Sequence, residues 1–233
     1  MKITQDIGIR ICGTGSSVPE RKISNDDMAT IVETNDEWIR TRTGISNRHF
    51  ADKETNLSLG MEAAEKALEM AGISKEEIGV VICATITPDN IVPSQACMLQ
   101  KELGLPETVF AFDICAACTG FLYAVHTARS LLCSMPEKKY ALVVASEVLS
   151  RVTNFADRNT CVLFGDGAGA AVITLDENSR YAFDCGAEGN TEVLYCPKYY
   201  HDTNPFAENL PEPAEQFVSM QGRAVYSLSL IHI

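Results

Sequence analysis

The sequence lacks a long hydrophobic run, a leader segment and an excess of basic charge. No apolar stretch in the 233 residues approaches the ~18 that a membrane-spanning helix requires, so we expect no membrane association. The first ten residues, MKITQDIGIR, contain no apolar core of a signal peptide. Lys and Arg number 19 against 31 Asp and Glu, giving a net charge of −12. This balance disfavours nucleic acid and anionic membranes as partners.

Metal-binding patterns are also scarce. The four histidines form no His-x-x-x-His motif, and Cys-x-x-Cys occurs once, at Cys115 and Cys118. A structural zinc site would need a second ligand pair, so we expect no metal. The nine cysteines are odd in number and follow no secretion signal, which favours a reducing, cytoplasmic compartment over a disulfide framework.

Strand and helix patterns alternate along the first three quarters of the chain. The segments predicted as strands are 7–15, 78–86, 108–114, 138–148 and 169–175, and those predicted as helices are 24–33, 56–72, 93–104 and 119–135. This alternation predicts an α/β layered core. After residue 176 the pattern weakens, and residues 177–215 are polar and loop-like.

Helix boundaries are marked by capping residues. Ser24 followed by Asp27 predicts a capped start, Gly72 predicts a stop, and Pro93 predicts the start of another helix. The apolar stripe of the helix at 56–72 is predicted to comprise Leu57, Met61, Ala64 and Leu68.

The stretch DICAACTGF joins a predicted strand to a predicted helix. Cys118 would lie at the helix N-terminus, where free N–H groups and the helix dipole stabilise a thiolate. Gly120 would let the helix start pack closely against neighbouring backbone. Position alone leaves three alternatives open: a nucleophile, a redox pair with Cys115, and an inert buried cysteine.

The stretch FGDGAGAAV, residues 164–172, formally fits the glycine spacing of dinucleotide-binding loops. Its glycines lead into a predicted strand, however, whereas such a loop requires a helix there. The sequence also lacks the Gly-Lys-Ser/Thr of a phosphate-binding loop. We therefore expect a structural glycine turn.

The stretch TNDEWIRTRTGI, residues 34–45, contains the single tryptophan. Trp38 and Arg42 are four residues apart and would share one face of a helix. An aromatic ring beside a guanidinium suits base stacking and phosphate pairing. The alternative, favoured on the segment alone, is a capped surface helix anchored by its tryptophan.

Together these stretches resemble β-ketoacyl-acyl carrier protein synthase III. The matching pieces are GTGSSVPE, TNDEWIRTRTGI, ACMLQKELG, FDICAACTGF, YALVVASEVLSR, DRNT and FGDGAGAAV, in the family's order and spacing from residue 8 to about 227. The resemblance implies the thiolase-like α/β fold, built from two similar halves with five-stranded mixed sheets. The N-terminal half would cover residues 1–176, and residues 177–227 would form a linker and the beginning of the second half.

The resemblance also implies an activity. This family initiates type II fatty acid synthesis: it transfers an acyl group from acyl-CoA to an active-site cysteine, then performs a decarboxylative Claisen condensation with malonyl-acyl carrier protein. Such an acyltransferase uses acyl-CoA as a substrate, binds no permanent cofactor and forms a homodimer. Cys118 matches the nucleophile, and Cys115 falls where the family carries a small residue, so we expect one working thiol.

Further residues match the family's binding positions. Trp38 and Arg158 match the pair that sandwiches the adenine of coenzyme A, and Thr34 and Arg42 lie in the same nucleotide-binding segment.

Three more matches concern the acyl and pantetheine sites. Val92 matches the position that reaches across the dimer to shape the partner's acyl pocket. Met220 and Gly222 match the wall of the pantetheine tunnel.

The sequence departs from the family near its end. The family's catalytic His and Asn lie in HQAN-like and NTSA-like motifs, and neither occurs here; His201 and Asn204 in HDTN come too early. The family would continue along an amphipathic helix after Ser227, but the sequence reads LSLIHI there. We therefore expect residues 228–233 to be a foreign or out-of-frame tail on a truncated chain, and we expect this chain to be inactive alone. The alternatives are a non-catalytic CoA or acyl-thioester binder and, more remotely, a Cys-x-x-Cys redox or zinc protein.

Overall fold

The computed structural model describes residues 2–196, 217–222 and 224–225. These residues form two compact units, each assembled from separate stretches of chain. The first contains the chain up to Arg21, His49–Val148 and Asp166–Gly186, and the second contains Lys22–Arg48, Leu149–Gly165 and the described residues from Ala187 onward. The predicted half ending at residue 176 stays a prediction, and the predicted tail at 228–233 lies outside the described residues.

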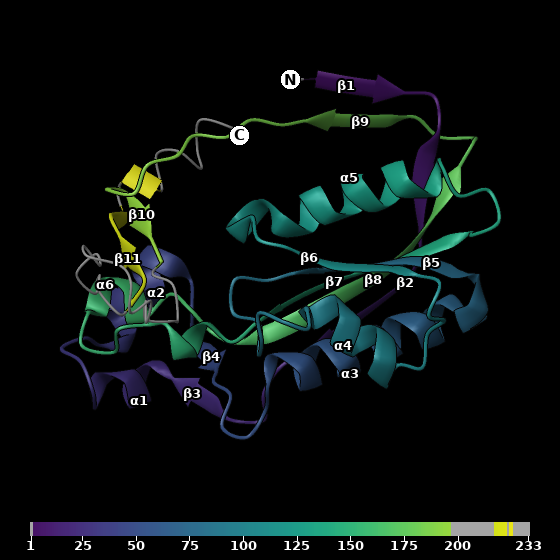
Figure 1. The fold of residues 1–233 in the computed structure, drawn as a ribbon. Coiled ribbons are helices and arrows are strands. Elements are labelled where there is room, and N and C mark those ends of the chain that lie inside the picture. The colour runs from purple at the N-terminus through teal and green to yellow at the C-terminus, as the bar shows by residue number, and fades with distance from the viewer. Residues whose placement is uncertain (1, 197–216, 223, 226–233) are drawn as a thin grey trace, which may run out of the picture. The chain divides into compact units, whose positions relative to one another are not determined.

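The first unit is built on a five-stranded mixed sheet with strand order β2-β8-β7-β5-β6 (Figure 1). The strands are β2 (Gly8–Ser17), β5 (Ile78–Ala84), β6 (Phe110–Ile114), β7 (Tyr140–Glu147) and β8 (Gly167–Asp176). Strand β5 runs parallel to β6 and β7, whereas β8 runs antiparallel to β7 and β2. The predicted α/β core and all five predicted strands are confirmed.

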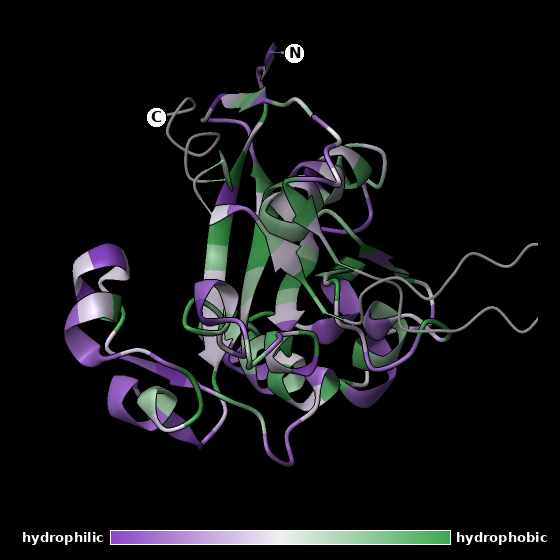
Figure 2. Cartoon of the chain, turned by 90° about the vertical axis from the view of Figure 1, so that its left-hand side faces the viewer, coloured by the Kyte–Doolittle hydropathy of each residue, from purple (hydrophilic) through white to green (hydrophobic). Residues whose placement is uncertain are grey.

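Helices cover both faces of this sheet. Helices α3 (Asn56–Ala71) and α4 (Gln95–Glu102) lie on one face and α5 (Gly120–Leu132) on the other (Figure 1). Each face has its own hydrophobic cluster, and all seven residues of β5 are buried. Figure 2 shows the strands of the sheet as mainly hydrophobic. Burial on both faces explains why β5 is a continuous apolar run rather than an alternating one.

Helix α3 packs on β2 through small residues. A Cβ atom on Gly13 or Gly15 would overlap the carbonyl oxygens of Ala67 and Ala63 on the helix. The helix face that lies against the sheet is therefore centred on its alanines. The stripe predicted for this helix is wrong in part, because Leu57 and Met61 are only partly buried while Ala63 and Ala67 are completely buried. The absence of side chains at Gly13 and Gly15 allows the helix to approach the strand closely, and the larger Leu57 and Met61 pack against the hydrophobic cluster that includes these alanines.

The predicted caps are largely confirmed. Ser24 and Asp27 form a capping box on α1 (Asn25–Ala29), and Gly72 ends α3 in the left-handed conformation. The start predicted at Pro93 is wrong by two residues, because α4 begins at Gln95 after the N-cap Ser94, which accepts a hydrogen bond from the amide of Cys97. Pro93 therefore precedes the cap.

Several short elements have no counterpart in the predicted pattern. The remaining strands are β1 (Lys2–Gln5), β3 (Lys22–Ser24), β4 (Asn47–His49), β9 (Tyr181–Asp184), β10 (Leu194–Tyr195) and β11 (Ser219–Met220). They form three two-stranded sheets, β1-β9, β3-β4 and β10-β11. Strands of two to four residues are too short for a periodic signal.

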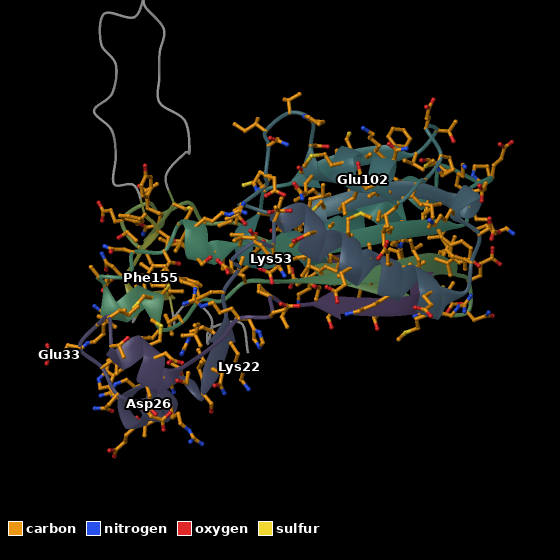
Figure 3. The ribbon with its side chains drawn as sticks, turned by 90° about the horizontal axis from the view of Figure 1, so that it is seen from below. Lys22, Asp26, Glu33, Lys53, Glu102 and Phe155 are labelled. Atoms are coloured by element: carbon orange, nitrogen blue, oxygen red, sulfur yellow. The ribbon has the colours of Figure 1, made fainter. Side chains whose placement is uncertain are left out.

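The second unit also contains short helices. Its α-helices are α1, α2 (Asp36–Thr43) and α6 (Arg158–Cys161), and the three 3-10 turns of the described chain are η1 (Lys75–Glu77), η2 (Ala117–Thr119) and η3 (Leu149–Arg151). Figure 3 labels Lys22, Asp26 and Glu33, three exposed charged residues of this unit. No helix in the described part of the chain has the length and hydrophobicity to cross a membrane.

Candidate active site

Cys118 lies in a tight turn between β6 and α5. Strand β6 ends at Ile114, the 3-10 turn η2 follows, and α5 begins at Gly120. Ala117 adopts a left-handed conformation with φ of 42°, the one non-glycine residue among those described with positive φ. Such a conformation costs of order 1–3 kcal/mol and persists only where the surrounding structure enforces it. Cys118 is an exposed free thiol on this strained turn.

The end of β5 supports the turn at both of its ends. The amide of Thr85 donates to the carbonyl oxygen of Ile114 at 3.2 Å, just before the turn. A Cβ atom on Gly120, just after the turn, would lie 3.1 Å from the Cβ of Ala84. The helix start is closely packed at Gly120 as predicted, but its nearest neighbour is the side chain of Ala84 and not backbone. Residues 84–85 fix where the turn begins and where it ends.

Cys115 is exposed as well. It is also a free thiol, one residue beyond the end of β6. Exposure therefore does not distinguish the two cysteines, and the role of each stays a prediction. Among the described residues, no three or more His, Cys, Asp or Glu side chains gather as a metal site would require.

A buried polar network lies at the carboxyl ends of β5 and β7, and the sequence analysis missed it. Glu147, at the end of β7, accepts hydrogen bonds from the amides of Ile86 (2.8 Å) and Thr87 (3.1 Å) and from the hydroxyls of Thr85 (3.2 Å) and Thr87. The completely buried Asn56 donates to the Thr85 hydroxyl at 3.0 Å and to the Ser146 carbonyl at 2.7 Å. Polar residues ending two apolar strands were the available signal, since carboxyl ends of parallel strands meet at one sheet edge.

Two carboxyl groups of this region have raised pKa values. Burial raises the pKa of Glu147, and its hydrogen bonds only partly oppose that effect. Burial likewise raises the pKa of Asp113, which accepts from the amides of Gln95 (2.7 Å) and Ala96 (2.8 Å) at the start of α4. In both cases backbone donors, rather than cations, satisfy the charged form.

Trp38 lies in the second unit, on α2, beneath two arginines. Asn35 caps the helix by accepting from the amide of Trp38 at 2.7 Å. The guanidinium carbon of Arg42 is 4.6 Å from the indole centroid, and that of Arg158, from α6, is 4.9 Å from it. Arg158 also donates to the carbonyl oxygen of Glu33 at 3.0 Å. The predicted capped helix is present, and the structure adds a distant arginine that sequence spacing could not place.

Other predicted binding residues of the second unit lie nearby in the fold. The Thr34 hydroxyl is buried and has no hydrogen-bond partner among the described residues. Met220 belongs to β11, which pairs with β10 and lies against α6, the helix that carries Arg158. Gly222 is exposed two residues later.

Val92 belongs to the first unit and is 84% exposed, beside Ile91 at 67%. Of the histidines, His126 stacks on Phe183 with ring centroids 4.3 Å apart. His201 and Asn204 lie outside the described residues.

Comparisons with solved structures identify the fold. A priming β-ketosynthase from the R1128 polyketide pathway is 32% identical with a TM-score of 0.81, over 96% of this chain and 66% of that one. The crystal structure of 3-oxoacyl-[acyl-carrier-protein] synthase III from Aquifex aeolicus is 39% identical with a TM-score of 0.77, over 95% and 67%. The fold is thus the thiolase-like fold of condensing enzymes.

Sequence comparisons define the family. The model of 3-Oxoacyl-[acyl-carrier-protein (ACP)] synthase III matches residues 112–189, which include the Cys118 turn. β-Ketoacyl-[acyl-carrier-protein] synthase III of Clostridium acetobutylicum is 43% identical over 224 residues, covering 95% of this chain and 68% of the relative. That of a Wolbachia strain is 48% identical over 187 residues, covering 79% and 58%. The chain belongs to the β-ketoacyl-[acyl-carrier-protein] synthase III family of acyltransferases.

Proposed function

We propose that this chain accepts an acyl group from acyl-CoA on Cys118. The thiolate sulfur attacks the thioester carbonyl carbon, a new thioester forms, and coenzyme A leaves as the thiol after taking up a proton. The observation that carries the proposal is the strained turn that exposes Cys118 where β6 meets α5. Strained backbone is typical of positions where function requires a side chain to be presented.

The Trp38 cluster supports binding of the nucleotide end of acyl-CoA. Arg42 and Arg158 bring two positive charges within 5 Å of one indole ring. A guanidinium pairs with phosphate oxygens, and an indole or guanidinium plane stacks on a purine. Thr34, Met220 and Gly222 complete the proposed CoA-binding set.

The second proposed step is decarboxylative condensation with malonyl-acyl carrier protein in a cytoplasmic homodimer. Val92 would shape the partner's acyl pocket, and its high exposure supports a role outside its own core. The His and Asn motifs of the family do not occur within these 233 residues. We therefore expect this chain by itself to stop at the acyl-enzyme.

Intact mass analysis after incubation with acetyl-CoA tests the first step. We expect one acetyl group, located on Cys118 by peptide mapping and lost in Cys118→Ser. Cys115→Ser is the matched control, since it removes an equally exposed thiol from the same segment, and it should still be acetylated. Acetylation of Cys115 instead would overturn the assignment. CoA binding without any adduct would favour the alternative, a non-catalytic acyl-thioester binder.

A further inference from the structure

Glu147 is held in an unusual way for a carboxylate. It lies partly buried at the end of β7, and its two oxygens accept from the consecutive amides of Ile86 and Thr87 and from the hydroxyls of Thr85 and Thr87. In the described part of the chain, no Lys or Arg forms an ion pair with it. Leaving a buried backbone N–H without an acceptor costs of order 1–3 kcal/mol. Glu147 therefore fixes the conformation of residues 85–87.

Residues 84–87 in turn support the Cys118 turn. Thr85 donates to Ile114 on one side of the turn, and on the other side Ala84 leaves little room for a Cβ atom at Gly120. A shift of the segment that Glu147 holds would be transmitted to both ends of the turn, because packed backbone cannot absorb it locally.

Neighbouring groups reinforce the same segment. Asn56 donates to the hydroxyl of Thr85 and the carbonyl of Thr87, and the Val148 amide donates to the Thr87 hydroxyl at 2.9 Å. These bonds orient the threonine hydroxyls so that their protons point at Glu147. The carboxylate thus accepts from the two amides and the two hydroxyls of residues 85–87, while Asn56 and Val148 donate to the threonines around it.

We infer that Glu147 is a positioning residue for acyl transfer: through Thr85–Thr87 it holds the turn that presents Cys118 to the thioester. The inference rests on the proposed acyl transfer. Glu147 does not touch the reacting atoms in this account. Its effect should appear in the rate constant of the chemical step and not in CoA affinity, because the nucleotide-binding residues belong to the second unit.

Glu147→Gln tests the inference with the complete 233-residue chain. The amide keeps the shape but cannot accept all four hydrogen bonds. We expect the acetylation rate constant of Cys118 at saturating acetyl-CoA to fall about tenfold, since small misplacements of reacting groups cost up to ~10²-fold. The half-saturating acetyl-CoA concentration should not change. Glu77→Gln, which removes a partly exposed carboxylate paired with Lys139, is the control and should acetylate at the wild-type rate.

Two further measurements keep the outcomes distinct. Hydrogen exchange should show faster exchange of the Ile86 and Thr87 amides in Glu147→Gln, and iodoacetamide alkylation of Cys118 should change in rate. If the wild-type chain is not acetylated, the proposed function fails. The hydrogen-exchange and alkylation measurements still test the positioning role in that case. Should Glu147→Gln not fold, Thr85→Val removes one hydroxyl from the same network and should slow acetylation severalfold. Wild-type rates in the variant that folds, or a change confined to half-saturation, would overturn the inference.

Discussion

Cys118 and Trp38 are supported by different kinds of structure. Cys118 lies on a strained turn whose two ends rest on buried strand β5, with a network of buried hydrogen bonds beneath it. Trp38 lies on a helix of eight residues, and the arginines over its ring have long side chains, of which Arg42 is exposed. The thiol is fixed by backbone, whereas the aromatic cluster is held together by side chains. Changes around Cys118 should therefore alter rates, and changes around Trp38 should alter affinity.

The largest expected effect concerns the second chemical step. We expect the 233-residue chain to form no acetoacetyl-carrier product from acetyl-CoA and malonyl-acyl carrier protein, even where Cys118 is acetylated. Decarboxylation places negative charge on the thioester oxygen. The His and Asn motifs of the family, which would supply hydrogen-bond donors to that oxygen, do not occur within these 233 residues. Loss of one preorganised donor typically costs ~10²–10³-fold in rate. Mass spectrometry of the carrier protein measures the product. Product formation at the rate of the acetylation step would show that other residues supply this function.

A second prediction tests how rigid the Cys118 unit is. Gly15→Ala should lower the free energy of unfolding by about 1–3 kcal/mol, because the added methyl would overlap the Ala63 carbonyl on α3. Denaturant titration followed by circular dichroism measures the loss. Gly169→Ala is the control, since a Cβ there meets no atom within 4 Å, and it should change little. Equal effects of both variants would contradict the close packing of α3 on β2.

The third prediction addresses the Trp38 cluster. Arg158→Ala should weaken CoA binding by about 1 kcal/mol, the contribution of one cation over an aromatic face. Quenching of Trp38, the sole tryptophan, reports binding directly. Arg40→Ala serves as the control. It removes an exposed arginine that pairs with Asp36 on α2, the helix that carries Trp38. Unchanged affinity in Arg158→Ala would remove it from the nucleotide site.

The smallest expected effect is a pH dependence of stability. Burial raises the folded-state pKa of Glu147, so its contribution to the unfolding free energy is fully present below the ordinary Glu pKa of about 4.3 and is lost as pH rises through the raised value. Glu54 has the opposite sign: backbone hydrogen bonds lower its pKa to about 2, so its contribution is lost as pH falls. As pH rises, the denaturation midpoint of wild type should therefore fall relative to that of Glu147→Gln and rise relative to that of Glu54→Gln. Parallel curves would contradict the burial of Glu147.

The sequence predicted the five strands of the central sheet and the helices that cover it, because each has a clear period or cap. Strand β5 is apolar throughout, and Gly72 ends α3 as expected. The buried face of α3 was misjudged, since a hydrophobic stripe gives no weight to alanines that approach glycine backbone.

The candidate site was predicted unevenly. Cys118 and Trp38 stand in distinctive local stretches, so sequence alone singled them out. Glu147 did not stand out, because its partners at residues 85–87 are about 60 positions away and become neighbours only when β5 and β7 pair. Arg158 is also far from Trp38 in the sequence and meets it only in the fold, so family resemblance alone placed the two together.

The left-handed residue before Cys118 sets the stability of the folded chain against a fixed position for the sulfur. Glycine adopts positive φ without steric cost, so a glycine at position 117 would relax the turn and stabilise the folded chain. It would also let the turn sample other conformations and present the sulfur less consistently. A substitution that gains stability at position 117 would therefore come at the expense of a fixed position for the Cys118 sulfur.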